Sequence, residues 1–221
     1  MLVVAKAPVP GRAKTRLSPP ATPDQAADIA AASLLDTCGA AGSVRGAQVV
    51  VAWTGDVDVA ARSPEVVAAL DRVRVVPQRG GNLGARLAAA HASAGQVAAG
   101  APVFQLGMDT PQVGPGLVES GLQQLERSDA VLGPASDGGW WALGVRDPRW
   151  AAVLRRVPMS RPDTGERTAW ELRRAGLRVA ELPEMSDVDT MRDARLVAEQ
   201  VPASRFAEAV REVPLLAEEH A

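Results

Sequence analysis

The first apolar run of the sequence is followed by a loop that is rich in basic side chains. This loop, KAPVPGRAKTRL at residues 6–17, follows residues 2–5, and no acidic residue occurs before Asp24. It carries four cations: Lys6, Arg12, Lys14 and Arg16. Cations gathered at one place can bind an anion such as a phosphate, and the alternative is a solvated basic turn. The loop is therefore a candidate anion site whose counterpart must lie elsewhere in the chain.

The same loop matches only part of a P-loop, the phosphate-binding pattern G-x-x-x-x-G-K-[ST]. Lys14 and Thr15 follow a glycine and an apolar run, but Ala13 stands where the second glycine is required. Pro19 and Pro20 also prevent a helix from starting at the Lys-Thr pair, so no helix N-terminus points at a phosphate. Any phosphate bound here would be held mainly by side-chain charge.

Two acidic segments contain the residue types that a divalent cation needs. Asp109, in GMDTP, follows an apolar run, and one carboxylate there suits Mg²⁺, which takes other ligands from water and substrate phosphate. Asp187 and Asp189, in SDVDTMRDA, could face the same ion, with Asp193 as a third acid. The alternatives are Asp109 as a turn former or N-cap, and Asp189 or Thr190 as the N-cap of the following helix. A metal site held by two distant segments is one interpretation.

Two glycine-rich turns could bring a ligand close to the backbone. In ASDGGWW, Asp137 precedes Gly138 and Gly139, and these residues with Trp140 are a candidate acceptor-binding segment, although a tight hairpin turn also explains the glycines. In QRGGNLGARL, residues 78–87, the polar side chains could contact a base or an acceptor. The alternative for this second segment is a glycine turn followed by an N-capping asparagine.

Short β-branched apolar runs alternate with Ala/Leu-rich segments of helical length. The predicted strands cover residues 2–5, 47–53, 73–76, 102–106, 130–132 and 178–182. The predicted helices cover residues 23–38, 83–97, 117–125 and 168–174. Thr22 and Gln25 form a capping box before the first helix, and Gly39 is expected to end it. This alternation is typical of an α/β fold with a mainly parallel sheet.

Four Pro/Gly-rich segments each follow a predicted strand. They lie at residues 7–20, 77–84, 107–116 and 133–139. Because ligands bind at the carboxyl ends of the strands in an open α/β sheet, the four segments can share one site. The length of 221 residues suits a single domain over residues 1–221, with a helical tail from about residue 203 to residue 221.

Composition excludes several classes of function. The 24 basic and 26 acidic residues nearly balance, so bulk charge gives no sign of binding to nucleic acid or an anionic membrane. Cys38 is the only cysteine, and no long apolar run or signal peptide is apparent, which favours a cytoplasmic protein. The serine-hydrolase, zincin and dinucleotide-binding motifs are absent. His91, in an Ala-rich segment, and His220, near the end, are not convincing catalytic bases.

The ordered set KAPVPGRAKTRL, QRGGNLGARL, GMDTPQ, LGPASDGGWWALG and DVDT resembles the DUF2064 family of the GT-A (nucleotide-diphospho-sugar transferase) superfamily. More distantly, it is similar to phospholactate and molybdenum-cofactor guanylyltransferases. The resemblance runs from about residue 2 to residue 198. It implies a Rossmann-like α/β/α sandwich that binds a nucleotide through its N-terminal half and a divalent metal between the two Asp segments.

The resemblance also implies roles for individual residues. Lys14 and Arg16 match the family's basic loop and, with Asp109, are the predicted catalytic residues. The predicted metal ligands for Mg²⁺ or Mn²⁺ are Asp109, Asp189 and Asp187. The predicted acceptor-binding residues are Asp137, Gly138, Gly139 and Trp140. The predicted nucleotide-binding residues are Lys6, Pro8, Gly11, Arg12, Lys14, Arg16, Gln78, Gly80, Asn82, Gly84 and Arg86.

Three functions fit these residues. The first is metal-dependent nucleotidyl transfer from an NTP to a small phosphorylated or acidic acceptor, which the basic loop and the single Asp of GMD favour. The second is glycosyl transfer from a nucleotide-diphosphate sugar, the activity for which some family members are named. The third is a non-catalytic nucleotide-binding protein, because Asn82 stands where relatives often carry an acid. A monomer or a homodimer is expected, with a nucleotide and a small-molecule acceptor as its partners.

Overall fold

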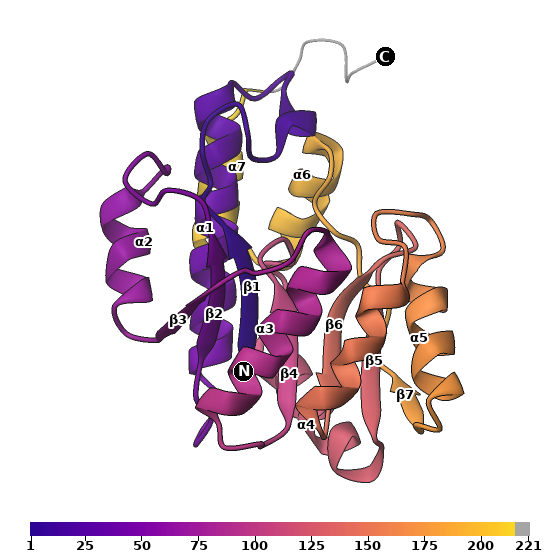
Figure 1. Cartoon of the computed structure of the whole chain (residues 1–221). Helices are drawn as coiled ribbons and strands as arrows, with labels where there is room; N and C mark the ends of the chain where they lie inside the picture. Colours follow the sequence, from indigo (N-terminus) through magenta and orange to yellow (C-terminus); the bar gives the residue numbers. More distant parts are fainter. Residues whose placement is uncertain (215–221) are drawn as a thin grey trace.

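The computed structural model describes residues 1–214, in which one seven-stranded sheet lies between two layers of helices (Figure 1). The strands are β1 (Leu2–Lys6), β2 (Val50–Thr54), β3 (Arg74–Pro77), β4 (Val103–Gly107), β5 (Ala130–Pro134), β6 (Trp140–Val145) and β7 (Val179–Glu181). Their order in the sheet is β3-β2-β1-β4-β6-β5-β7. All the pairings are parallel except the two that β6 makes with β4 and β5. The predicted α/β fold with a mainly parallel sheet is therefore confirmed.

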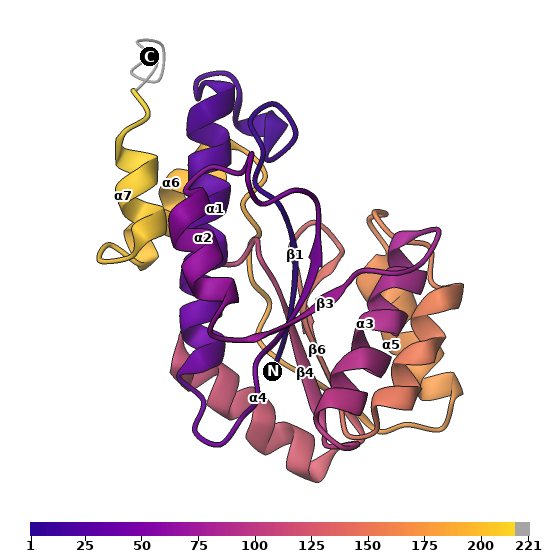
Figure 2. The same ribbon diagram turned by 60° about the vertical axis from the view of Figure 1, so that its left-hand side comes forward.

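Helices cover both faces of the sheet, as Figure 2 shows. One layer contains α1 (Pro23–Gly42), α2 (Ser63–Leu70) and α4 (Pro115–Arg127). The other contains α3 (Leu83–Val97), α5 (Thr164–Arg174) and the 3-10 segment η2 (Pro148–Arg156). Two C-terminal helices, α6 (Met191–Gln200) and α7 (Arg205–Arg211), pack beside α1. The short 3-10 turn η1 (Thr15–Leu17) precedes α1.

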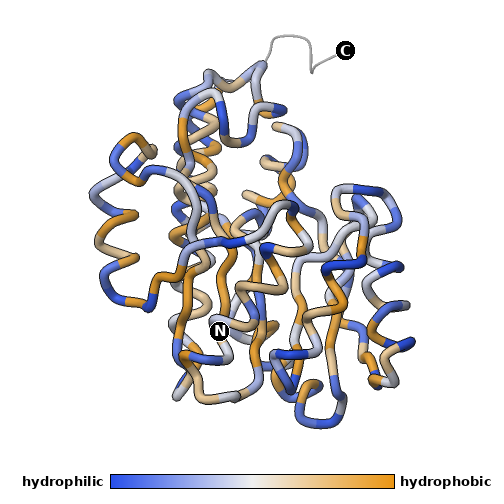
Figure 3. The backbone as a smooth tube through the Cα atoms, in the orientation of Figure 1, coloured by the Kyte–Doolittle hydropathy of each residue, from blue (hydrophilic) through white to orange (hydrophobic). Residues whose placement is uncertain are grey.

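The core follows from the alternation of side chains along the strands. In β1, Leu2 packs in the cluster under α3, whereas Val3 and Ala5 pack in the cluster under α1. Hydrophobic segments accordingly run through the strands in the middle of the molecule (Figure 3). Burial also raises the pKa of the Cys38 thiol to about 11.

Element boundaries agree with the prediction at the starts of α1 and α3, whereas α4 begins at Pro115 rather than at residue 117 and α5 at Thr164 rather than at residue 168. The Thr22–Gln25 capping box forms, but α1 continues past Gly39 to Gly42 because Ala40 and Ala41 are buried helix formers. The strand predicted at residues 47–53 begins only at Val50, whose partner is the first residue of β1.

The predicted C-terminal tail contains α7, and residues 215–221 of that tail lie outside the described residues. None of the helices within residues 1–214 is long and apolar enough to cross a membrane.

Candidate functional site

Two cavities meet at the carboxyl ends of the parallel strands. The first, which we call the polar cavity, has a volume of about 230 Å³ and is lined by Lys6, Arg12, Lys14, Arg16, Asp109 and Asp189, among others. The second, the deep cavity, has a volume of about 310 Å³ and includes Leu83, Gln105, Asp137, Trp140, Met159 and Asp187 in its lining. Both include Met108 and Asp109. All four Pro/Gly-rich segments contribute residues to these two cavities.

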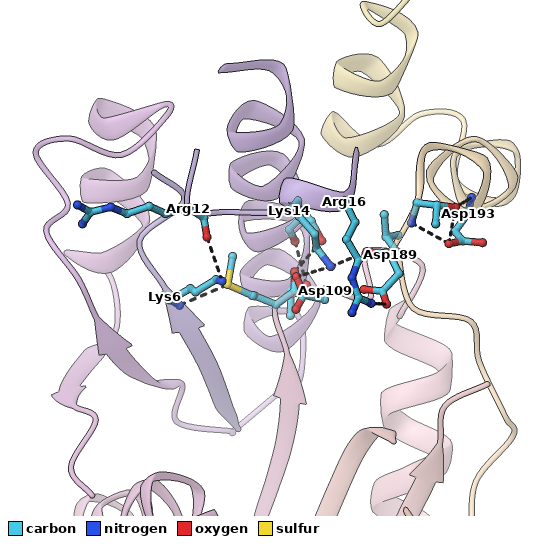
Figure 4. A network of polar contacts seen from close by, with 12 residues as sticks. Lys6, Arg12, Lys14, Arg16, Asp109, Asp189 and Asp193 are labelled. Atoms are coloured by element: carbon cyan, nitrogen blue, oxygen red, sulfur yellow. Dashed lines mark hydrogen bonds and ion pairs between the residues drawn. The ribbon is translucent and has the colours of Figure 1, made fainter. Parts of the chain in front are cut away.

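Lys14 bridges the two acidic segments of the chain. Its ammonium lies 2.9 Å from the carboxylate of Asp109 and donates a hydrogen bond to the backbone carbonyl of Val188. The side chain is only 12% exposed, and the residue has φ of 47°, a left-handed conformation that costs a non-glycine residue about 1 kcal/mol. Buried Ala13 and Leu17 hold the loop on either side. The strained backbone thus places this cation at the meeting point of residues 109 and 188 (Figure 4).

The other three cations of the loop lie nearer to solvent. Arg16 donates to Asp189 at 2.8 Å, and its side chain is 76% exposed. Lys6 donates a long hydrogen bond of 3.4 Å to the carbonyl of Arg12. Within residues 1–214, no carboxylate lies within ion-pair distance of Lys6 or Arg12. Both residues belong to the lining of the polar cavity, although the Arg12 side chain extends away from Asp109 and Asp189 (Figure 4).

The turn that carries Asp109 is fixed from α1 and β1. Ser33, buried in α1, donates to the carbonyl of Met108 at 2.7 Å, and the backbone N–H of Lys6 lies 3.3 Å from the Met108 sulfur. Thr110 is also buried. Asp109 itself remains about half exposed at the junction of the two cavities. Its carboxylate can therefore reach a ligand from a rigid support.

The second acidic segment lies beside this turn. The side-chain amide of Gln112 donates to the carbonyl of Ser186, which ties the two segments together. The pKa of Asp187 is raised, mainly by burial and further by the negative charges of Asp137 and Asp189. These carboxylates therefore share a region of negative potential, in which a bound cation would be stabilised.

Asp193 has a different role. It forms a capping box with Thr190 at the start of α6, with the Thr190 N–H donating to its carboxylate at 2.8 Å. This contact resolves the sequence alternatives, since Thr190 is the N-cap of α6 and Asp189 is left to pair with the basic loop.

The Asp-Gly-Gly segment forms the turn between β5 and β6 and also lines the deep cavity. Asp137 accepts a hydrogen bond of 2.7 Å from the N–H of Gly139, which shapes the hairpin. Gly138 has φ of 84°, and a Cβ atom there would lie 1.8 Å from the carbonyl oxygen of Pro162. Trp140 contributes to the cavity wall. The hairpin alternative is therefore correct for the glycines, while the predicted role in acceptor binding stays a prediction.

The segment at residues 78–86 has clear structural contacts. The Gln78 amide donates to the carbonyls of Ala5 at 2.8 Å and Ala52 at 3.0 Å. Asn82 caps α3 by accepting from the N–H of Ala85 at 2.8 Å, as one alternative expected.

The remaining nucleotide-binding candidates are placed as follows. Gly80 and Gly84 pack closely against neighbouring backbone, Arg86 has a buried Nε, Pro8 accepts from Ala61, and Gly11 is open with φ of 72°. Of residues 78–86, the linings of the two cavities contain only Leu83. Nucleotide binding by this segment therefore stays a prediction.

Several cavity residues carried no motif in the sequence. Met159 and Arg161 come from the segment between η2 and α5, and Val188 acts through its backbone carbonyl. Gln105 is different, because a single polar residue inside the apolar run VFQL is a visible signal of a buried polar contact.

The acidic residues fit a cation that needs few protein ligands. Within residues 1–214 there is no group of three or more His, Cys, Asp or Glu side chains that could hold a metal ion. Oxygen atoms of Asp109 and Val188 nevertheless converge on one positive charge, the Lys14 ammonium. Mg²⁺ is commonly bound through one or two carboxylates, with substrate phosphates and water as its other ligands. The donor set therefore suits a metal that arrives with a phosphate ligand.

Comparison with known families decides the relationship of the chain. The model of the family described as "Uncharacterized protein conserved in bacteria (DUF2064)" matches residues 35–161, more than half of the sequence. The chain belongs to the DUF2064 family. The resemblance drawn from the motifs is thereby confirmed. Among curated proteins, none matches the sequence.

Solved structures share the DUF2064 chain's architecture. A protein of Desulfovibrio desulfuricans G20, provisionally named a nucleotide-diphospho-sugar transferase, is 29% identical, with 96% of this chain and 93% of that chain covered and a TM-score of 0.83. CMP:2-keto-3-deoxy-manno-octonic acid synthetase in complex with CTP is 14% identical (91% and 97% covered, TM-score 0.56). Rv0371c of Mycobacterium tuberculosis H37Rv, in complex with manganese, is 23% identical (90% and 97% covered, TM-score 0.50). The latter two support the fold alone.

Proposed function

We propose that this protein is a transferase that moves a nucleotidyl group from an NTP to a small phosphorylated or acidic acceptor. The observation that carries the proposal is the junction at Asp109, where a cavity lined by four basic side chains meets a second, more apolar cavity. Such an arrangement suits a polyphosphate on one side and an acceptor on the other. The bond that is exchanged would lie between them, beside the carboxylate.

The basic loop has the charge that a triphosphate requires. Lys6 and Arg12 have no acidic partner within residues 1–214, so they can bind phosphate oxygens without breaking an ion pair. Lys14 and Arg16 pair with Asp109 and Asp189, and they would exchange these carboxylates for phosphate oxygens when a nucleotide binds. Positive charge near the β- and γ-phosphates would stabilise the departing pyrophosphate.

A divalent metal would be held by Asp109 together with Asp189 or Asp187. When bound, it would supply charge neutralisation at the reacting phosphate. The raised pKa of Asp187, caused by burial and neighbouring carboxylates, supports a cation there, and the manganese complex of Rv0371c supports a metal in this fold. Lys14 would then release Asp109 to the metal and remain close enough to contact the phosphate.

Glycosyl transfer from a nucleotide-diphosphate sugar is the second candidate. The specific observation in its favour is the 29% identity to a protein named for nucleotide-diphospho-sugars. Both functions would place phosphates in the polar cavity, so the number of phosphates and the second substrate distinguish them. Asn82 no longer favours a non-catalytic protein, because its capping contact accounts for the residue type.

A thermal-shift panel tests these two candidates. The purified protein is heated with CTP, GTP, ATP, UTP, UDP-glucose and GDP-mannose, each with and without Mg²⁺ or Mn²⁺. A ligand at 100 times its dissociation constant adds about 2.7 kcal/mol of stability, which shifts the melting temperature visibly. Metal-dependent stabilisation by an NTP, with none from a nucleotide sugar, supports nucleotidyl transfer. The opposite pattern would establish the second candidate in its place.

Two variants locate the effect at the site. Asp109→Asn should abolish the metal-dependent part of the shift, and Lys14→Ala should weaken triphosphate binding more than monophosphate binding. Asp71→Asn and Arg72→Ala, at the exposed end of α2, are matched controls that should leave both shifts unchanged. Equal weakening of triphosphate and monophosphate by Lys14→Ala would remove the role assigned to Lys14.

A further inference from the structure

A glutamine lies at the floor of the deep cavity. Gln105, in the middle of β4, is only 3% exposed and belongs to the cavity lining. Its side-chain oxygen lies 2.9 Å from Nε2 of His91, a fully buried residue of α3. The two polar side chains pair beside an apolar cluster, and Leu87 of α3 and Val4 of β1 line the same cavity as Gln105.

The tautomer of His91 fixes the orientation of this glutamine. Burial lowers the pKa of His91 to about 4, so the imidazole is neutral at physiological pH. Its other nitrogen, Nδ1, has no partner within residues 1–214. A buried N–H without an acceptor costs more than a bare lone pair, so the proton belongs on Nε2. His91 therefore donates to the Gln105 oxygen, and the amide NH₂ of Gln105 must point elsewhere.

The Gln105 NH₂ group is available to a ligand. Among residues 1–214, no acceptor bonds this nitrogen. It is not among the fully buried side-chain atoms that lack a partner, so it keeps some contact with solvent. The cavity beside it is the space that it can reach. A donor that is nearly buried, held in one orientation and facing a cavity is a specificity element, because a ligand without an acceptor would leave it unsatisfied.

The surroundings indicate which acceptor group fits. Val4, Leu83, Leu87 and Met159 give the cavity apolar walls. Its charged residues come from loops: Asp109, Asp137 and Asp187 from loops that follow strands, and Arg161 from the segment between η2 and α5. Gln105 itself is neutral and lies in the strand below. A carboxylate placed against it would lose its hydration without gaining a counter-charge, whereas a carbonyl or hydroxyl oxygen would gain a hydrogen bond at little cost.

We propose that the deep cavity binds the acceptor substrate as an apolar body whose neutral oxygen, of carbonyl or hydroxyl type, accepts a hydrogen bond from Gln105, with His91 as the positioning residue. The role of this ligand as the acceptor substrate rests on the proposed function, whereas its binding in the cavity is independent of that function. An acidic or phosphorylated group of the same substrate would then lie toward Arg161, away from the floor.

Two small probes of nearly the same shape test this inference without nucleotide or metal. Cyclohexanone carries a carbonyl oxygen where methylenecyclohexane carries a CH₂ group. Each is titrated into ¹⁵N-labelled protein while the side-chain amide signal of Gln105 and the indole signal of Trp140 are followed. Cyclohexanone should bind about three- to tenfold more tightly and shift the Gln105 amide, as expected for one neutral hydrogen bond. The amide of Gln78, which bonds two carbonyls, should not move.

Variants separate specificity from structure. Gln105→Leu should remove the preference for cyclohexanone, while both probes still shift the Trp140 indole. His91→Leu should reduce the preference, and His91→Gln, which retains a donor near Nε2, should keep it. Equal affinity of both probes for the native protein, or failure of cyclohexanone to shift the Gln105 amide up to its solubility limit, would overturn the inference. A positive result here beside a negative NTP panel would retain the binding site and reject the proposed transfer reaction.

Discussion

The two ion pairs of the basic loop should contribute unequally to stability. Lys14 is 12% exposed, bonds both a carboxylate and a backbone carbonyl, and has a partner that is 47% exposed. Arg16 is 76% exposed and bonds only Asp189. A hydrogen bond to a charged group contributes about 1.5–3 kcal/mol, less when one partner is hydrated, so we expect Lys14→Met to cost about 1–2 kcal/mol. Arg16→Met should cost about 0.2–1 kcal/mol, the usual value for an exposed pair.

Urea unfolding at low and high salt measures this difference. Salt screens the exposed pair more strongly, so the effect of Arg16→Met should shrink as salt is added while most of the Lys14→Met effect persists. Both variants keep a long unbranched side chain, which makes each the control for the other. If Arg16→Met costs as much as Lys14→Met, or if salt abolishes both effects alike, the assignment of Lys14 as the semi-buried link between the two acidic segments is wrong.

Three further outcomes follow from the structure. Gly138→Ala should cost at least about 3 kcal/mol, because its Cβ would meet a backbone oxygen. Gly11→Ala, with φ of 72° in open space, should cost about 1 kcal/mol. Equal melting temperatures of the two variants would refute the clash at Gly138. Gln78→Ala should cost about 1–3 kcal/mol by removing two hydrogen bonds to strand carbonyls, against at most about 0.5 kcal/mol for exposed Gln123→Ala, measured by urea unfolding. For His91, the pKa of about 4 in the folded protein lies below the ordinary histidine value of 6.5, so the unfolded chain binds the proton first as the pH falls. The native protein should therefore lose stability relative to His91→Gln between these two pH values, by up to about 1.4 kcal/mol per pH unit, and the difference should level off below pH 4; parallel pH profiles would contradict this.

The starts of α1 and α3 were predictable because their signals are local. Thr22 and Gln25 satisfy each other across one turn, and Asn82 caps α3 through the N–H of Ala85. Such contacts lie within three residues of one another and depend little on the rest of the fold. Gly39 was misleading because it is also a local signal, whereas the continuation of α1 to Gly42 depends on the burial of Ala40 and Ala41 against the rest of the fold.

The partners of the site residues could not be predicted from spacing. The sequence indicated cations in residues 6–17 and carboxylates at positions 109 and 189, and assigned them to phosphate and to metal. The structure instead pairs Lys14 with Asp109 and Arg16 with Asp189, because each charge is stabilised by its opposite. The His91–Gln105 pair escaped prediction because neither residue belongs to a motif, although a polar residue in each apolar segment was visible.

The link between Lys14 and Val188 joins residues 174 positions apart, and that between Arg16 and Asp189 joins residues 173 apart. Contacts of such long sequence separation form late in folding, since a large loop must close before they contribute. During synthesis, Lys14 could meet Asp109 midway, but the basic loop would wait for almost the whole chain before meeting Val188 and Asp189. The polar cavity is thus completed only when the chain is nearly finished, so a chain cut short before residue 186 would leave Arg16 without its carboxylate and Lys14 with Asp109 alone.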